Sequence, residues 1–180
     1  MRVIAGSLGG RRLKAPAGKN TRPTSDRVKE ALFAMLGDLE GVRVMDLFAG
    51  SGALGIEALS RGAVVAVFVE RDARAAGVLA ENLDALGLGP DRAEIRRAEA
   101  IAALKRSRER EETYDLLLID PPYRLAGEIS AELAEIVPPL LSGGARVAVE
   151  SDRREPLELG LQVERQRRYG DTCITIHRHP

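Results

Sequence analysis

The sequence predicts an α/β domain with a doubly wound, mostly parallel sheet. Aliphatic runs of strand length alternate with segments of helix length between residues 42 and 151. The runs are continuous rather than alternating, as expected for parallel strands that helices cover on both faces. Near the end of the chain, two β-rich segments flank a turn-like Tyr-Gly-Asp-Thr at 169–172, which predicts an antiparallel hairpin at the sheet edge. In such folds ligands bind at the carboxyl ends of the strands.

Each element has a local signal. A first helix is expected from Thr24, because Thr24, Ser25 and Asp26 are capping residue types, apolar residues follow at helical spacing, and Gly37 closes the pattern. The same reasoning predicts strands over 42–50, 63–70, 92–97, 114–123 and 143–151, helices over 52–62, 73–89, 98–110 and 126–141, and a hairpin over 161–178.

Composition indicates one globular domain in a reducing compartment. The 180 residues, 44% hydrophobic and 30% charged, are typical of a single soluble domain. A single cysteine, Cys173, excludes an internal disulfide, and no stretch approaches the ~20 apolar residues that span a membrane. We expect a cytoplasmic protein, and we expect a monomer without a metal ion.

Charge is distributed unevenly along a chain whose net charge is zero. Residues 1–30 hold eight basic and two acidic residues, a net charge of +6, so the remaining 150 residues sum to −6. A basic arm on a mildly acidic body favours docking of a polyanion at one end, and a solvated extension is the alternative. We therefore divide the chain into a basic N-terminal extension, 1–23, expected to form a β-hairpin, and an α/β domain, 24–180.

A glycine loop follows the first predicted strand. Residues 50–55, GSGALG, fit G-x-G-x-x-G between a strand and a helix, where glycines permit a tight turn and the helix N-terminus offers free N–H groups. Glu70 ends the next strand, where a carboxylate can accept both hydroxyls of a ribose. These features predict an adenosine-type ligand, and both NAD and S-adenosylmethionine satisfy them.

Asp46 favours one of these two ligands. It lies at the end of the first strand, four residues before Gly50. An acid there would repel a pyrophosphate but attract the ammonium and sulfonium of S-adenosylmethionine. A purely structural capping acid is the alternative. Glu99 follows the third strand. It either accepts a hydrogen bond from the adenine amino group or, as an acid in the first turn of the following helix, interacts favourably with the helix dipole.

The segment LLLIDPPY, residues 116–123, ends a buried strand with an acid, two prolines and a ring. Asp120 and the Pro121 carbonyl can each accept an N–H from an exocyclic amine, which holds the nitrogen lone pair toward a methyl group. Pro122 helps to fix that geometry, and Tyr123 offers a face on which an extruded base can stack. The structural alternative is that the two prolines simply terminate the strand.

The predicted cofactor site comprises Asp46, Phe48, Ala49, Gly50, Ser51, Gly52, Glu70, Arg71, Glu99, Ala100 and Asp120.

Four stretches together resemble the RsmD-type methyltransferases over nearly the whole chain. They are RVIAGSLGGRRLKAP…RPTSDRVKEALFAML, DLFAGSGALGIEALSRG, DPPY and YGDT. The resemblance implies a Rossmann-like class I fold with a seven-stranded sheet, and S-adenosylmethionine as the donor. It also implies methylation of the N2 amine of guanine 966 in 16S rRNA, presented on the small ribosomal subunit with its proteins. Glu99 departs from the aspartate that is commonest at this position in the wider class.

The basic extension fits such a substrate, because lysine and arginine contacts to phosphates position RNA in a salt-sensitive manner. Arg22, Pro23 and Thr24 match the family's RPT segment, where a loop can close over the cofactor. The residues that we expect to contact RNA are Arg2, Arg11, Arg12, Lys14, Arg22, Thr24 and Arg27.

Three other functions stay open: an adenine-N6 methyltransferase of DNA or RNA, a nicotinamide-dependent oxidoreductase, and a non-catalytic RNA-binding module. Five further residues receive structural interpretations. Cys173 is expected to be a small buried hydrophobe, His177 and His179 to lie in a solvated tail, and Glu57 and Arg61 to form a surface pair one helical turn apart.

Overall fold

The structure, a computed structural model, describes residues 1–16, 26–154 and 157–180, and for residues 123–126 it describes the backbone alone. Its elements are, in chain order, α1 (Asp26–Leu36), β1 (Arg43–Leu47), α2 (Ala53–Ser60), β2 (Val65–Val69), α3 (Ala73–Ala85), β3 (Ala93–Arg96), α4 (Ala100–Glu109), β4 (Tyr114–Ile119), α5 (Tyr123–Ile136), the 3-10 turn η1 (Pro138–Leu140), β5 (Leu141–Asp152), β6 (Gln162–Tyr169) and β7 (Thr172–Arg178).

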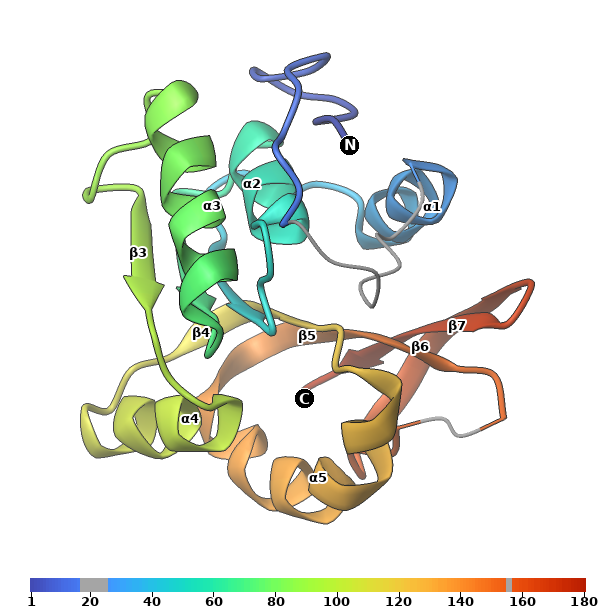
Figure 1. Cartoon of the computed structure of the whole chain (residues 1–180). Coiled ribbons are helices and arrows are strands. Elements are labelled where there is room, and N and C mark those ends of the chain that lie inside the picture. The colour runs from blue at the N-terminus through green and yellow to red at the C-terminus, as the bar shows by residue number, and fades with distance from the viewer. Residues whose placement is uncertain (17–25, 155–156) are drawn as a thin grey trace.

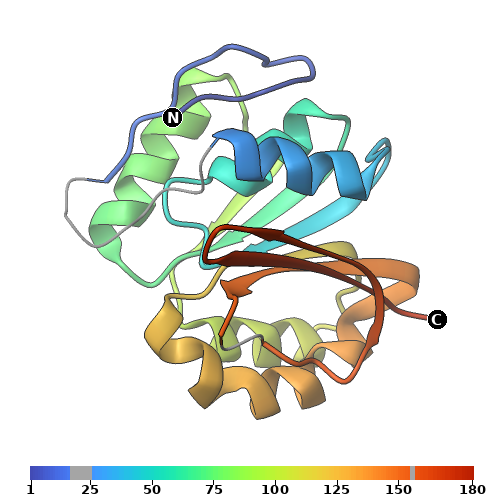
Figure 2. The same ribbon diagram turned by 90° about the vertical axis from the view of Figure 1, so that its right-hand side faces the viewer.

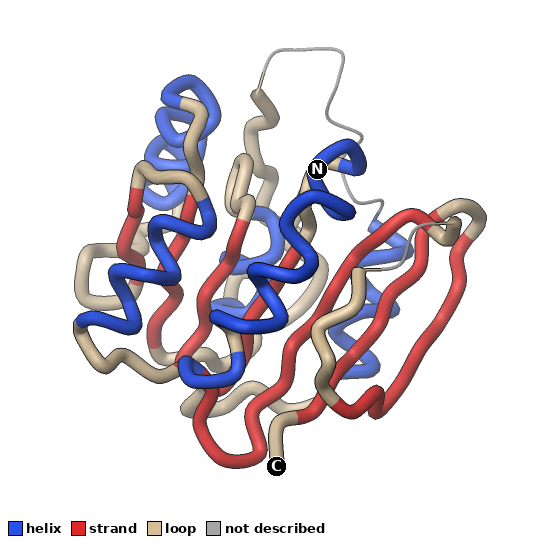
Figure 3. The backbone as a smooth tube through the Cα atoms, turned by 90° about the horizontal axis from the view of Figure 1, so that it is seen from below, coloured by secondary structure: helices blue, strands red, loops and turns tan. Residues whose placement is uncertain are grey.

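One seven-stranded sheet organises the domain, in the order β3-β2-β1-β4-β5-β7-β6 (Figures 1 and 3). The first five strands in this order pair in parallel, and β7 runs antiparallel to both β5 and β6. The predicted doubly wound sheet with an antiparallel C-terminal hairpin is therefore confirmed. Because α2 leads from β1 to β2 while β4 lies on the other side of β1, the topological switch point falls between β1 and β4.

Helices cover both faces of the sheet. Figures 1 and 2 show α1, α2 and α3 on one face and α4 and α5 on the other. Two cores result: Phe33, Leu79 and Leu116 belong to the cluster under α1–α3, and Leu104, Leu117 and Leu133 belong to the cluster under α4 and α5. Neighbouring strand residues thus supply opposite cores, which explains the unbroken aliphatic runs.

The fifth helix differs from its predicted range of 126–141. It begins three residues earlier, at Tyr123, and ends at Ile136. Pro138 and Pro139 follow, and the chain continues as a 3-10 turn into β5. A proline removes the N–H that an α-helix needs, so the helix cannot extend to residue 141.

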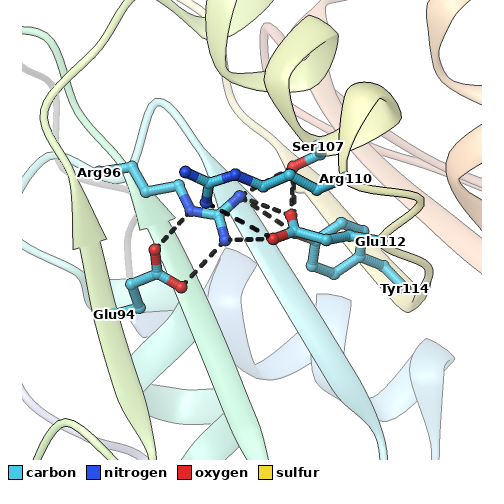
Figure 4. Close-up of polar contacts among 6 residues, drawn as sticks. All are labelled: Glu94, Arg96, Ser107, Arg110, Glu112 and Tyr114. Atoms are coloured by element: carbon cyan, nitrogen blue, oxygen red, sulfur yellow. Dashed lines mark hydrogen bonds and ion pairs between the residues drawn. The ribbon is translucent and has the colours of Figure 1, made fainter.

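A charged network fastens the end of α4 to the sheet (Figure 4). Arg96 donates to Glu94 at 2.7 Å and to Glu112 at 2.7 Å, and Glu112 also accepts from Ser107 and Tyr114. These hydrogen bonds lower the pKa of Glu112 to about 2. Since Ser107 and Tyr114 are buried, this network connects the last turn of α4 to β4.

The N-terminal segment folds back on itself across an antiparallel bridge between Arg2 and Arg12. The Val3 amide donates to the Arg11 carbonyl at 2.9 Å, and the side chains of Val3 and Leu13 are buried in the α1–α3 core. Residues 17–25, with Arg22 and Thr24, lie outside the described residues. The division of the chain at residue 23 stays a prediction.

Candidate functional site

Three strand ends bring the predicted site residues to one edge of the sheet. Leu47 of β1 pairs with Val69 of β2 on one side and with Ile119 of β4 on the other. The next residues, Phe48, Glu70 and Asp120, therefore leave three adjacent strands side by side, about 5 Å from strand to strand. The glycine loop and the DPPY segment flank the switch point, where folds of this kind bind ligands.

The backbone of the glycine loop takes conformations that few side chains allow. Gly50 and Gly52 have φ of 55° and 85°, and Phe48 has a φ of 67°. A Cβ on Gly52 would lie 2.3 Å from Cδ1 of Leu79, so a side chain there would collide with α3 as well as strain the turn. A bulky residue at positive φ costs roughly 1–3 kcal/mol and is found most often at functional loops.

Glu70 fixes this loop from the neighbouring strand. Its Oε2 accepts from the Gly50 amide at 2.8 Å, and its Oε1 accepts from the Asp72 amide at 2.7 Å. A carboxylate oxygen has two lone-pair sites, so each oxygen keeps capacity for a further donor such as a ribose hydroxyl. The ribose contact itself stays a prediction.

Asp46 is 1% exposed and holds the first turn of α2, because its Oδ2 accepts from the Gly55 amide at 2.8 Å. Burial, opposed by that hydrogen bond and assisted by the charge of Glu70, raises the pKa of Asp46 to about 7. The hydrogen bond agrees with the structural interpretation of this acid. A buried carboxylate with a raised pKa is also the group that a cationic ligand would stabilise most.

At the next strand end, Arg71 and Glu99 form an exposed ion pair with Nη1 and Oε1 3.4 Å apart. Glu99 stands at the N-cap of α4 without a side-chain capping bond, and Ala100 behind it is buried. The carboxylate is therefore not occupied by the helix amides, which leaves both interpretations of Glu99 open.

The DPPY segment begins directly after β4. Asp120 is half-buried, Pro121 is buried, and Pro122 is exposed at the N-cap of α5. Tyr123 is the first residue of α5, but its side chain lies outside the described residues. The two prolines fix the direction in which the chain leaves the strand, so the Asp120 and Pro121 acceptors belong to a rigid corner.

Asn82 is a site residue that the sequence analysis missed. Its buried amide donates to the Ser51 carbonyl at 3.0 Å and to the Lys14 carbonyl at 3.1 Å, and its Oδ1 accepts from the Lys14 amide at 2.8 Å. One side chain of α3 thus joins the glycine loop to the N-terminal segment. The sequence feature that could have revealed Asn82 is a polar residue between Leu79 and Leu83, at a position of an amphipathic helix that faces the core.

The predicted Glu57–Arg61 pair exists, at 2.8 Å, but its placement on the surface is wrong. Glu57 is 0% exposed, and its carboxylate accepts from the amides of Ile4 and Ala5 and lies 3.2 Å from the buried Lys29 ammonium. The N-terminal segment covers this face of α2, which the helical spacing of the pair did not reveal. Glu57 is therefore an anchor for the N-terminal segment.

The described basic residues of the extension are exposed, and several of them already form ion pairs or hydrogen bonds within the protein. Arg2 pairs with Asp26 at 3.0 Å, Lys14 pairs with Glu81 at 2.7 Å, and Arg11 donates to the Ala85 carbonyl at 3.0 Å. The side chains of Arg12 and Arg27 are exposed. Their contacts with RNA stay predictions, and those of Arg22 and Thr24 fall on residues that the structure does not describe.

Two interpretations near the C-terminus have different outcomes. Cys173 is buried in β7, as expected. His177 is buried as well, with Nδ1 3.3 Å from the Leu161 carbonyl, so its assignment to a solvated tail is wrong. It belongs to β7, which lies between β5 and β6 in the sheet.

The described residues contain no group of three or more histidine, cysteine or acidic side chains that could hold a metal ion. Within the same ranges, no helix has both the length and the apolar character needed to cross a bilayer. Apart from the guanidinium of Arg71, which is paired with Glu99, the polar groups described at the strand ends are carboxylates, backbone amides and a carbonyl, which together suit a nucleoside that carries a positive charge.

Known proteins match the chain over nearly its full length. It is 42% identical over 183 residues to "Putative rRNA methyltransferase YlbH" of Bacillus subtilis, covering 99% of this chain and 98% of the relative. It is 36% identical over 160 residues to "Ribosomal RNA small subunit methyltransferase D" of Haemophilus influenzae, covering 87% and 81%. The solved structure "Putative methyltransferase yhhF from Escherichia coli" matches with a TM-score of 0.83 and 31% identity over 99% of this chain and 97% of that chain.

A more distant structure, SMU.776, "a putative methyltransferase complexed with SAH", matches over 84% of this chain and 48% of its own, with a TM-score of 0.68 and 16% identity, a likeness of fold alone. The family model described as "Conserved hypothetical protein 95" matches residues 1–178. The predicted resemblance to RsmD-type methyltransferases is therefore confirmed, and the chain belongs to the Conserved hypothetical protein 95 family.

Proposed function

We propose that this protein methylates ribosomal RNA, with S-adenosylmethionine as donor and the N2 amine of a guanine in 16S rRNA as acceptor. By resemblance the target is guanine 966, presented on the small ribosomal subunit. Relatives named as rRNA and small-subunit rRNA methyltransferases support the substrate class. The register that aligns Phe48, Glu70 and Asp120 at the switch point carries the proposal, since it supports a nucleoside site at the glycine loop next to an amine site at the DPPY corner.

The residues of the site fit the donor. The space beside Gly50 is open, with no atom within 4 Å of the position that a Cβ would take, so a ligand can approach the loop there. Glu70 has further acceptor capacity for a ribose, and Asp46 is a buried acid that a cation would stabilise. S-adenosylmethionine supplies a methyl group on a sulfonium, which becomes a neutral thioether as the amine nitrogen takes the carbon.

The DPPY corner would prepare the amine. Its nitrogen lone pair is delocalised into the base, so Asp120 and the Pro121 carbonyl each accept one N–H and favour a tetrahedral nitrogen whose lone pair points at the methyl carbon. The carboxylate also stabilises the positive charge that develops on nitrogen. The surplus proton then leaves to water or to Asp120.

Methyl transfer to small subunits from a strain that lacks the modification tests the proposal. Nucleoside mass spectrometry should find N2-methylguanosine, whereas N6-methyladenosine would establish the alternative chemistry. Asp120→Asn should lower the transfer rate at least ~100-fold, far more than it lowers the affinity for S-adenosylmethionine, because the carboxylate borders the predicted cofactor site but its chemical role is on the acceptor amine. The matched control, Asp84→Asn on the exposed side of α3, should leave both unchanged. No methylated nucleoside in the wild-type reaction would refute the proposed function.

A further inference from the structure

The outermost strand of the sheet is rich in arginine. β6 forms one edge and pairs with β7 alone, and its residues from Gln162 to Arg168 are exposed. Within that stretch lie three arginines and one acid. We call Arg165, Arg167 and Arg168 the arginine edge.

Register places two of these arginines on the face that α1 covers. Arg165 pairs with Ile176 and Arg167 with Ile174, and both isoleucines belong to the core under α1–α3. Alternation along a strand therefore directs Arg165 and Arg167 toward that side, while Arg168 faces the other. Figure 2 shows α1 beside the β6–β7 hairpin, on the same side as the N-terminal segment.

The arginine edge approaches the edge of the sheet that carries the candidate site. β6 ends at Tyr169, which pairs with Thr172, and Thr172 pairs with Asp152 at the carboxyl end of β5. The order β4-β5-β7-β6 separates β6 from the strand of Asp120 by three inter-strand steps, about 14 Å in total. An RNA strand whose base enters the DPPY corner spans that distance in a few nucleotides.

The described fold neutralises little of this charge. Among the described residues, the ion pair found for the three is the exposed contact between Arg165 Nε and Glu164 Oε1, at 3.9 Å, too long to be strong. Charge on an edge strand discourages sheet-to-sheet pairing, but clustered like charges repel one another unless an anion lies between them. The guanidinium fork matches phosphate oxygens in shape and charge.

We propose that the arginine edge is a second RNA-contacting surface that binds backbone phosphates beside the target nucleotide. This inference rests on the proposed function and adds a contact surface on the opposite flank of the site from α3. It predicts that β6 contributes to substrate affinity and not to donor binding or chemistry, because it holds the strand without touching the reacting atoms.

The test is the double charge reversal R165E/R167E, assayed by binding to small subunits and to a 16S rRNA transcript across a series of KCl concentrations. We expect Kd to rise at least ~10-fold at moderate salt. The plot of log association constant against log salt concentration should become less steep by about 1.4–1.8, or 0.7–0.9 for each of two lost phosphate contacts. Donor affinity, kcat and the thermal midpoint should stay unchanged, and R165K/R167K should retain most of the slope.

The control R106E/R108E makes the same charge change on exposed residues in the last turn of α4, next to the amino end of β4. Equal effects of the two double variants would overturn the inference, since a general charge effect would explain both. Weaker binding with an unchanged salt slope would also overturn it, and would indicate a protein contact instead. Methyl transfer by the wild-type protein is measured separately and tests the proposed function. Binding to the transcript tests the arginine edge, and it does so even if no methyl transfer is found.

Discussion

Replacement of Asp46 by asparagine should change the pH dependence of stability in the ligand-free protein. The Asp46 carboxyl has a native pKa of about 7, raised by burial from an ordinary value of 3.8. Between these two values the native state holds a proton that the unfolded state has released, so the free energy of unfolding falls as pH rises. The wild-type protein therefore loses stability from pH 4 to pH 7, and asparagine removes this loss.

The magnitude follows from the two pKa values. Linkage gives a native-state penalty of roughly 2 kcal/mol at pH 5 and roughly 4 kcal/mol at pH 8, a difference of about 2 to 3 kcal/mol. Asparagine can still accept from the Gly55 amide, but its buried NH₂ group costs a further ~1–3 kcal/mol at every pH. Because that cost is constant, it cancels when the two pH values are compared.

Urea unfolding at pH 5, 6, 7 and 8 measures the effect. Relative to wild type, the midpoint of Asp46→Asn should rise by about 1 M between pH 5 and pH 8, for an m-value near the upper end of ~1–3 kcal/mol/M. Asp84→Asn, on an exposed carboxylate, should show no such trend. A midpoint difference that is the same at pH 5 and pH 8 would refute the reasoning, since it would place the Asp46 pKa near its ordinary value.

Three further predictions concern the supports of the site. Asn82→Leu removes the amide that donates a hydrogen bond to the Ser51 carbonyl, so calorimetry should find the affinity for S-adenosylmethionine reduced about tenfold. An unchanged affinity would disprove the role of Asn82 in supporting the glycine loop. Glu57→Gln leaves the Lys29 ammonium buried beside a neutral group, which should cost roughly 3–5 kcal/mol and lower the melting temperature by about 10 °C; a shift under ~2 °C contradicts the anchor. Because the native pKa of Glu112 is about 2, below its ordinary 4.5, its stabilisation is complete above pH 4.5 and is lost as pH falls toward 2. Acid titrations of Glu112→Gln and wild type should therefore differ at pH 6 and converge near pH 2.

Local signals predicted much of the fold correctly. The run from Val65 to Val69 is a parallel strand buried on both faces, and the turn at 169–172 joins two antiparallel strands. The glycines at 50 and 52 occupy positive-φ positions of a strand–helix turn. Each of these features depends on a few consecutive residues, whose sterics and hydrogen-bonding capacity are the same in any context.

Burial of polar groups was predicted less well. Glu57 and Arg61 have the spacing of a pair one turn apart, which is the same on a surface and beneath a covering segment. Asn82 and His177 likewise carry no local mark of the partners that they meet. In each case the deciding contact comes from a segment that is distant in the sequence.

The sequence by itself determined the alternation of strands and helices, the glycine turn after β1 and the acid–proline corner after β4. The tertiary structure alone decided that the N-terminal segment covers Glu57, that Asn82 links this segment to the glycine loop, and that the arginines of β6 lie on the flank of the site. The physical reason is the range of the interactions. Periodicity and turn chemistry act over a few residues, whereas burial of a charge depends on which remote segment excludes water from it.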